Sequence, residues 1–263
     1  MSGCAWLILP TYDEAANLAA VVDDACAVLA GAAPEGFRVL VVDDASPDGT
    51  GDIADALAAM HPEVEVLHRP AKAGLGSAYQ AGFRRALDQR AAHVLLMDAD
   101  FSHDPADLAT LLERAREGAD LVVGSRYVPG GGVRDWGRMR RLVSRAGCWY
   151  ARRVLGVAVR DLTGGLECFR AEALESIDHA GLRSRGYAFH VELKWRALRC
   201  GLRVEETPIV FSARRGGRSK MTPRIALEAV WMVPALRLAT AADGVSRRPR
   251  RPRRTREPAP DHS

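Results

Sequence analysis

Two aspartates one residue apart, Asp98 and Asp100, are the residues of this sequence best suited to chemistry. They follow four apolar residues in the segment HVLLMDADFSHDPADL (93–108). Because side chains alternate along a strand, both acids point the same way if the extended backbone continues. Adjacent carboxylates repel, so one binds a proton at neutral pH unless a cation lies between them. Such hard oxygen ligands suit Mg²⁺ or Mn²⁺, although a solvated strand end would also explain the pair.

The elements that must position these acids form an alternating pattern in the first half of the chain. Strand patterns cover residues 4–10, 37–44, 64–69, 93–100 and 120–127, and helical patterns cover roughly 14–30, 51–60, 76–89 and 105–117. This alternation predicts an α/β fold, a Rossmann-like, mainly parallel sheet with helices on both faces. Ligands of such sheets bind outside the carboxyl ends of the strands.

Polar residues gather at those carboxyl ends. The first strand leads to Tyr12 and Glu14, the second to Asp44, the fourth to the aspartate pair and the fifth to Arg126. Core packing gives no reason for acids and an arginine to collect at one edge of a sheet. A cation bound together with a phosphorylated ligand does give a reason.

The second half of the chain is less regular. A glycine-rich loop is expected at 128–137, helices near 138–155 and 187–200, and strands at 163–170 and 204–212. A basic loop, RRGGRSK (214–220), precedes a last helix from about 223 to 241. The Arg/Pro-rich remainder cannot form a core. We therefore expect one domain over residues 1–241, ending in an amphipathic helix, and a disordered tail over 242–263.

Composition excludes several classes of protein. The tail holds seven arginines and three acidic residues, which accounts for the whole net charge of +4 and leaves the rest of the chain neutral, so a nucleic-acid partner is not expected. The five cysteines form no C-x-x-C pair, which argues against structural zinc and favours a reducing cytosol. No signal-peptide pattern and no apolar run near 18 residues are present, so we expect a cytoplasmic protein.

Nine motifs, in order over roughly residues 5–221, give the chain a resemblance to glycosyltransferase family 2 and its GT-A fold. These are LPTYDE (9–14), VVDDASPDGT (41–50), KAGLGSAYQAG (72–82), MDADFSHDP (97–105), VGSRYVPGGG (123–132), RRLVS (140–144) after Trp136, DLTGG (161–165), GYAFHVE (186–192) and RRGGRSKM (214–221). More narrowly, the set is similar to the polyprenol (dolichyl) phosphate mannose synthases. The sequence departs from their pattern at Ser102, Cys148, Glu167 and Ala213.

The resemblance implies an inverting transfer of mannose from GDP-mannose to a polyprenyl monophosphate, with Mg²⁺ or Mn²⁺ as cofactor. It implies a metal site at Asp98, Asp100 and Ser102. It implies catalytic roles for Asp100, Arg126, Arg214 and Lys220, and an acceptor-phosphate site at Arg126, Arg140 and Ser144. The implied donor-binding residues are Pro10, Tyr12, Glu14, Val42, Asp44, Asp98, Ala99, Asp100, Ser102, Arg214 and Lys220.

The acceptor of this reaction lies in a membrane, so we expect the protein at the inner face of the membrane as a peripheral protein. Trp231 and Leu238 belong to an apolar face of the last helix, which either lies on lipid or packs on the domain. The arginine-rich tail would favour anionic lipid. Lys72 either approaches phosphate or is solvated, and His190 is expected to be structural.

Three alternatives remain. The same reaction can use another sugar nucleotide such as UDP-glucose, and a catalytically inactive sugar-nucleotide-binding protein would carry many of the same motifs. A dinucleotide-dependent dehydrogenase is disfavoured, because Gly74 and Gly76 are not followed by the third glycine of that fingerprint.

Overall fold

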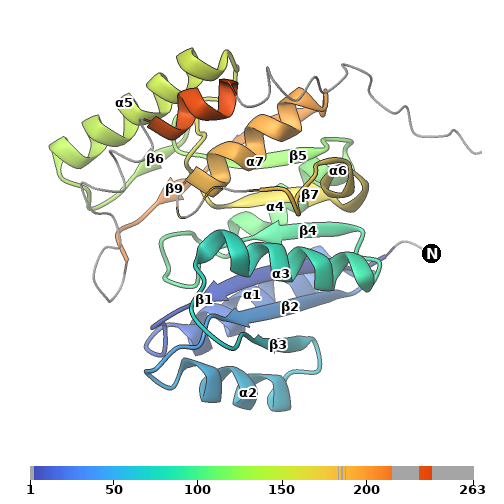
Figure 1. Cartoon of the computed structure of the whole chain (residues 1–263). Helices are drawn as coiled ribbons and strands as arrows, with labels where there is room; N and C mark the ends of the chain where they lie inside the picture. The colour runs from blue at the N-terminus through green and yellow to red at the C-terminus, as the bar shows by residue number, and fades with distance from the viewer. Residues whose placement is uncertain (1–2, 183, 185, 187, 215–230, 239–263) are drawn as a thin grey trace, which may run out of the picture.

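A seven-stranded sheet in the order β3-β2-β1-β4-β7-β5-β8 organises the chain (Figure 1). The computed structural model describes residues 3–182, 184, 186, 188–214 and 231–238. The strands are β1 (Ala5–Thr11), β2 (Phe37–Asp43), β3 (Val64–His68), β4 (His93–Leu96), β5 (Leu121–Ser125), β7 (Glu167–Arg170) and β8 (Val204–Pro208). All neighbours are parallel except β7, which is antiparallel to both β4 and β5. The predicted α/β class and mainly parallel sheet are confirmed.

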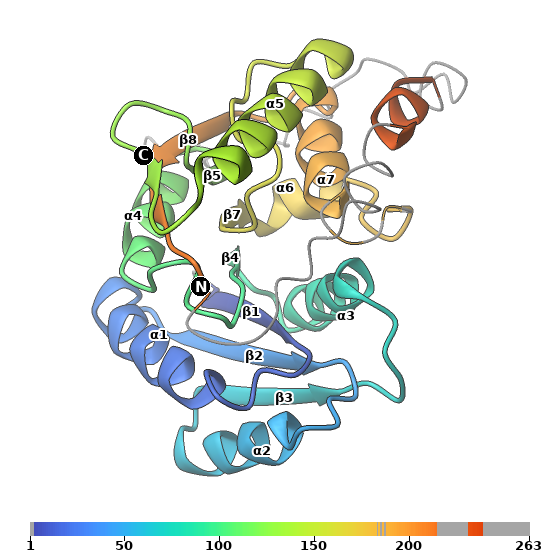
Figure 2. The ribbon, with the colours of Figure 1, turned by 90° about the vertical axis from the view of Figure 1, so that its left-hand side faces the viewer.

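Helices cover both faces of this sheet, as Figure 2 shows edge-on. The cluster on one face joins α1 (Leu18–Ala32), α2 (Thr50–Met60) and α4 (Asp107–Arg116) to alternate residues of β1 and β2. The other face carries α3 (Leu75–Asp88), α6 (Ala171–Ser176) and α7 (Ala188–Arg199). Leu7 and Leu9 point to the first cluster and Trp6 and Ile8 to the second, because successive strand residues face opposite ways.

Further elements pack outside the seven-stranded sheet. The helix α5 (Arg138–Leu155) packs its buried Ala151 and Leu155 against Val191 and Trp195 of α7. The short strands β6 (Gly132–Val133) and β9 (Val210–Phe211) form a separate two-stranded sheet. Residues 231–238 are helical, and Val233 joins the same cluster as α5 and α7. Packing on the domain is one of the two roles expected for the last helix, and the contacts of Val233 accord with it.

Several boundaries differ from the sequence prediction. The strand predicted at 93–100 ends at Leu96, and the left-handed backbone of Phe101 (φ 58°) turns the chain soon after. The predicted loop 128–137 contains β6. The single strand predicted at 204–212 is split at Ile209, whose N–H donates to the Ser125 carbonyl at 3.1 Å. The second and third differences arise from long-range pairing, of β6 with β9 and of Ile209 with Ser125, which local periodicity does not encode.

The close approach of α3 to β1 gives the first prediction. A Cβ on Gly82 would lie 2.6 Å from Ile8 Cγ2, in the middle of the core. Gly82→Ala should therefore lower the free energy of unfolding by about 1–3 kcal/mol, measured by urea denaturation. Gly147→Ala is the matched control: this exposed helical glycine has nothing within 4 Å, so the change should stabilise by about 0.5–1 kcal/mol. Equal effects at both sites would contradict the packing described.

Candidate functional site

A cavity of about 360 Å³ opens at the carboxyl ends of β1, β2, β4 and β5. Its volume is in the range of small-molecule sites. It is lined by Pro10, Thr11, Tyr12, Glu14, Asp44, Lys72, Gly74, Leu75, Ala78, Asp98, Ala99, Asp100, Ser102, Arg126, Arg140, Thr163, Gly164, Gly165, Gly186, His190, Phe211 and Arg214. The clustering of acids and arginines that the strand ends indicated is therefore present in space.

The two aspartates form an acidic rim in this cavity although the strand ends before them. Asp100 is 1% exposed, and its Oδ1 accepts a hydrogen bond from the Ser102 backbone N–H at 2.9 Å. Its Oδ2 lies 2.5 Å from Arg214 Nε, an ion pair that neutralises the buried carboxylate. The Asp98 side chain is 26% exposed, and its Oδ2 lies 3.9 Å from His103 Nε2. One carboxylate is thus held rigidly, and the other is open to the cavity.

The donor set of this rim fits a divalent cation of the Mg²⁺ or Mn²⁺ type. It offers two carboxylates and the hydroxyl of Ser102, all hard oxygen ligands. Within the described part of the chain, no three His, Cys, Asp or Glu side chains converge as a complete metal cage. Mg²⁺ typically takes only one or two protein carboxylates and completes its shell with water and substrate phosphate. A cation at this rim would accordingly need a phosphorylated ligand as a co-ligand.

Residues after β1 and β2 form one wall of the cavity. Lys72 lines the cavity, and its Nζ lies 3.3 Å from the centroid of the Tyr12 ring. The Asp44 carboxylate accepts from Arg69 at 2.6 Å and from the N–H groups of Ala73 and Gly74 at distances down to 2.7 Å. Asp44 therefore fixes the loop that carries Lys72 as well as lining the cavity.

Arginines form the opposite wall. Both Nε and an Nη of Arg126 donate to the Asp161 carboxylate at 2.7 Å, and the same Nη donates to Thr163 at 2.7 Å. Burial alone would raise the pKa of Asp161, but Arg126 outweighs it and lowers that pKa to about 2. Arg140 belongs to α5, and its Cζ lies 4.1 Å from the centroid of the Trp136 ring. This wall presents fixed positive charge to the cavity.

Most of the predicted site residues meet in the cavity, whereas Val42 and Ser144 do not line it. Val42 is fully buried in the core between β2 and α3, so its side chain cannot contact a donor in the cavity. Ser144 does not line the cavity, and its hydroxyl accepts a hydrogen bond from Tyr127 Oη at 2.6 Å. Its predicted contact with the acceptor phosphate stays a prediction. Lys220 lies outside the described residues.

Several lining residues were not predicted. His190 was expected to be structural, yet it lines the cavity, and Thr163, Gly164 and Gly165 form part of the same wall. Their motifs, DLTGG and GYAFHVE, are visible in the sequence. The local pattern gave no signal that α7 would bring His190 beside the segment 163–165, since that contact depends on the antiparallel insertion of β7.

The comparison with known sequences identifies the class of protein. A sequence model of "Glycosyl transferase family 2" matches residues 6–178, which is more than half of the chain. The chain therefore belongs to glycosyl transferase family 2, and its sheet and helices have the GT-A fold, as expected.

Two relatives are similar over most of their length. A polyprenol monophosphomannose synthase of Mycolicibacterium smegmatis is 46% identical over 228 residues, 86% of this chain and 84% of that protein. An undecaprenyl-phosphate mannosyltransferase of Micrococcus luteus is 46% identical over 241 residues, 92% of this chain and 97% of that protein. The predicted narrower resemblance to polyprenol phosphate mannose synthases is confirmed.

Solved structures share the fold at lower identity. A glucosyl-3-phosphoglycerate synthase of Mycobacterium tuberculosis in complex with Mn²⁺, UDP-glucose and glycerol 3-phosphate has a TM-score of 0.62 at 20% identity, covering 90% of this chain and 80% of that one. The mannosyltransferase PcManGT of Pyrobaculum calidifontis in complex with GDP-Man and Mn²⁺ has a TM-score of 0.59 at 20% identity. The match covers 93% of this chain and 76% of that one. Both support the fold.

The Arg126–Asp161 pair gives a prediction about stability and pH. The folded pKa of Asp161, about 2, lies below the ordinary value of 3.8, so the ionised carboxylate stabilises the fold above about pH 4 and this contribution is lost as the pH falls through 2. Asp161→Asn should lower the free energy of unfolding by about 2 kcal/mol or more at pH 7. Urea denaturation at pH 7 and pH 3 should show a smaller difference from wild type at pH 3.

The control for this experiment is Asp24→Asn, a change at an exposed carboxylate on α1. It should stay within about 0.5 kcal/mol of wild type at both pH values. A difference for Asp161→Asn that is the same at pH 7 and pH 3 would contradict the ion-pair account.

Proposed function

We propose that this protein transfers mannose from GDP-mannose to a polyprenyl monophosphate, giving a polyprenyl phosphate mannose with inverted anomeric configuration. The single observation that carries the proposal is one cavity in which an acidic rim, Asp98 and Asp100, faces the arginine wall of Arg126 and Arg140. The rim suits a cation and a diphosphate, and the wall suits a second phosphate. The names of the two relatives at 46% identity support this choice of donor sugar and acceptor.

The acceptor itself supplies the nucleophile in this proposal. A phosphate monoester is largely ionised at pH 7, so no protein base has to remove a proton. An oxygen of the acceptor phosphate bonds to the anomeric carbon while the bond from that carbon to the donor diphosphate breaks, and GDP leaves. A single in-line displacement of this kind inverts the anomeric configuration.

The residues of the chain orient the two phosphorylated groups. Arg126 is locked by Asp161 and Thr163, so it can present its charge without reorganising. Arg140 adds a second cation on that wall. Arg214 already contacts Asp100 at 2.5 Å and stands at the rim where the leaving diphosphate would lie. Asp98, Asp100 and Ser102 would hold Mg²⁺ or Mn²⁺, which stabilises the negative charge of the leaving group when bound.

A catalytic role for Lys220 remains a prediction outside the described residues, and so does the disordered tail at 242–263. For the donor, Pro10, Tyr12, Glu14, Asp44 and Ala99 remain the proposed contacts, since all of them line the cavity. The nucleotide would lie against the wall that follows β1 and β2, with its diphosphate toward the rim.

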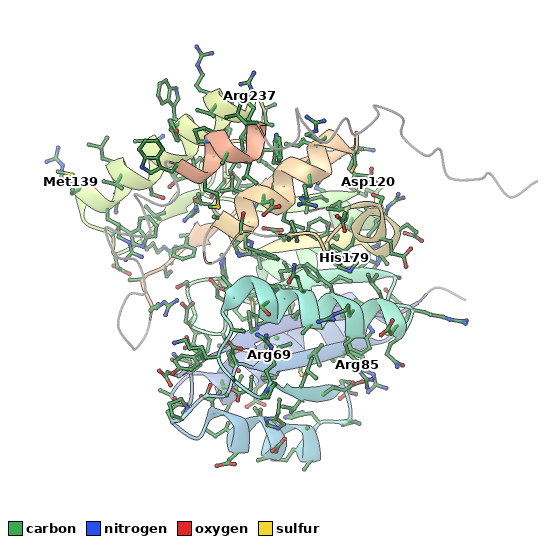
Figure 3. All side chains as sticks on the ribbon, in the orientation of Figure 1. Arg69, Arg85, Asp120, Met139, His179 and Arg237 are labelled. Carbon is green, nitrogen blue, oxygen red and sulfur yellow. The ribbon has the colours of Figure 1, made fainter. Side chains whose placement is uncertain are left out.

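The outer surface of α5 supports a peripheral position on a membrane. Met139, Leu142, Val143 and Trp149 are 71%, 63%, 47% and 62% exposed. Their spacing places them on one side of the helix, opposite the buried Cys148, Ala151 and Leu155. Figure 3 shows Met139 projecting away from the body of the protein. The helix sequence RMRRLVSRAGCWYARRVL has six arginines and no acid, which complements anionic lipid.

This orientation would place the cavity beside the bilayer surface, because Arg140 belongs to α5 and also lines the cavity. The phosphate of a membrane-held acceptor could then reach Arg140 without the lipid leaving the bilayer. Among the described residues, no helix has the length and apolarity to cross a membrane. The cytoplasmic side of the membrane remains part of the proposal.

The donor is tested by offering radiolabelled GDP-mannose, UDP-glucose and UDP-N-acetylglucosamine in turn to the purified protein, with polyprenyl phosphate and Mg²⁺ or Mn²⁺. Label should enter the lipid from GDP-mannose alone. Transfer from UDP-glucose instead would establish the alternative donor. Absence of transfer from all three would leave a sugar-nucleotide-binding protein and refute the proposal.

The metal rim is tested by Asp100→Ala. This change should reduce mannose transfer by at least about 100-fold, because Asp100 serves the leaving diphosphate and not the hydrophobic core. Thermal unfolding should show that the variant is folded. Glu113→Ala, at an exposed acid on α4, is the control and should transfer at the wild-type rate. A folded Asp100→Ala protein with normal transfer would defeat the assignment.

The membrane surface is tested by co-sedimentation with vesicles of phosphatidylglycerol and phosphatidylcholine. The double change Leu142→Ser and Trp149→Ser should weaken vesicle binding by about tenfold or more, since two large apolar side chains no longer enter the lipid. Met60→Ser is the matched control: Met60 is 66% exposed, but it lies on α2 at the opposite end of the sheet (Figure 1). An equal loss in both proteins would contradict the proposed orientation.

A further inference from the structure

Three charged or polar side chains are buried together behind the cavity. Glu167 on β7 and Lys194 on α7 are both 0% exposed, and His190 on α7 is 2% exposed. Glu167 Oε1 accepts from His190 Nδ1 at 2.8 Å and from Lys194 Nζ at 2.6 Å. The proposed transfer uses none of the three. Burying a glutamate and a lysine is unfavourable unless each is fully paired, so their presence calls for a physical reason.

Lys194 links this cluster to the wall of the cavity. Its Nζ also donates to the Gly164 carbonyl at 2.6 Å, and the Gly164 N–H donates to Asp161 Oδ1 at 3.0 Å. The segment 163–165 is therefore held from one side by Lys194 and from the other by the carboxylate that fixes Arg126. Burial would raise the pKa of Glu167, but Lys194 and His190 outweigh it and lower the pKa. Glu167 is accordingly a carboxylate that accepts hydrogen bonds.

The bond to Glu167 determines which ring nitrogen of His190 can serve a ligand. An ionised carboxylate accepts, so Nδ1 carries the proton that faces Glu167, and Nε2 is the ring nitrogen that remains to hydrogen-bond a ligand. None of the described residues hydrogen-bonds this Nε2. The ring is held in place by edge contacts with Tyr79 and Phe189, at 5.5 and 5.4 Å between centroids. A nitrogen fixed in this way is preorganised for contact with a ligand.

The geometry around Gly165 places this nitrogen near the acidic rim. A Cβ on Gly165 would lie 3.3 Å from His190 Nε2 and 3.6 Å from Asp98 Oδ2. Both groups therefore border the space that a side chain on residue 165 would occupy. Glycine at 165 keeps that space open to the cavity, of which both His190 and Asp98 are lining residues.

The order of the strands indicates which part of a donor would lie there. Tyr12 and Asp44 follow β1 and β2, on one side of β4, whereas Glu167 belongs to β7 on the other side. Arg126 follows β5, beyond β7. If the diphosphate lies at the rim after β4 and the acceptor phosphate at Arg126, the hexose lies between them. His190 borders this intermediate region.

We propose that His190 is a hexose-recognition residue, whose Nε2 forms a hydrogen bond with one hydroxyl of the donor sugar. Glu167 and Lys194 are positioning residues that fix its ring and the segment 163–165. The inference rests on the proposed function, since it needs a hexosyl donor. It explains why charges are buried here and identifies a contact to the sugar instead of the nucleotide.

The test uses GDP-mannose and its four deoxy analogues, each lacking the 2-, 3-, 4- or 6-hydroxyl. In the wild-type protein, removal of the contacted hydroxyl should lower kcat/KM by about tenfold. His190→Ala should lower kcat/KM for GDP-mannose by a similar factor. The same deoxy donor should then show no further loss in the variant, whereas the effects of the other three deoxy donors should be unchanged. This lack of additivity identifies the pair in contact.

Two conservative variants separate substrate contact from packing. His190→Asn keeps a donor near the position of Nδ1 for Glu167 but has no group at the position of Nε2, so its thermal stability should stay near wild type while its loss in kcat/KM matches that of His190→Ala. His190→Gln extends an amide toward the position of Nε2 and should recover part of the loss. Affinity for GDP, measured by calorimetry with Mn²⁺, should stay within about twofold of wild type in all three variants, because the contact is to the hexose.

The outcomes distinguish this inference from the proposed function. If the wild-type protein transfers no mannose to polyprenyl phosphate, the proposed function fails. If wild type transfers mannose and folded His190→Asn has wild-type kcat/KM, the inference is overturned and the proposed function stands. Losses from all four deoxy donors that simply add to the effect of His190→Ala would also overturn it.

Discussion

The need to neutralise two carboxylates in a buried cavity governs the site of this protein. Asp100 is almost fully buried, and its carboxylate is compensated by Arg214, 2.5 Å away, and by a hydrogen bond from the Ser102 N–H. Asp98 stays partly exposed beside it. On the arginine wall the buried charge is positive, and Asp161 neutralises it by pairing with Arg126. Carboxylates that suit a cation and arginines that suit an anion therefore line one cavity.

The sheet topology determines how far apart the charged groups of the cavity lie. The antiparallel strand β7 lies between β4 and β5, so it separates the acidic rim that follows β4 from Arg126 after β5. The space beside β7 is lined by the small residues Gly164 and Gly165 and by His190. The insertion of β7 in the strand order thus separates the two regions that we propose bind phosphate, and a hexose would lie between them. The helix α5 extends the second region to the surface through Arg140.

The sequence was sufficient to predict the features that depend on local periodicity and on the ends of strands. Alternating apolar runs predicted the α/β class, and the polar residues after those runs predicted that Tyr12, Asp44 and Asp98 would meet. Contacts between segments far apart in the chain could not be predicted from the sequence alone. Val42 belongs to a recognisable motif but is fully buried in the core cluster that α3 covers, whereas Asp44, two residues later, lines the cavity. Hydrogen bonds from His190 and Lys194 to Glu167 join α7 to β7, and the spacing of these residues in the sequence did not predict them.

The central claim is that the acidic rim binds the donor diphosphate together with a divalent cation, and calorimetric titration of the wild-type protein with GDP tests it most directly. One titration contains Mn²⁺ and the other contains EDTA. The rim carries carboxylates that repel a diphosphate unless a cation lies between them, so the account predicts binding at least about tenfold tighter with Mn²⁺. Equal affinity for GDP in Mn²⁺ and in EDTA would contradict it.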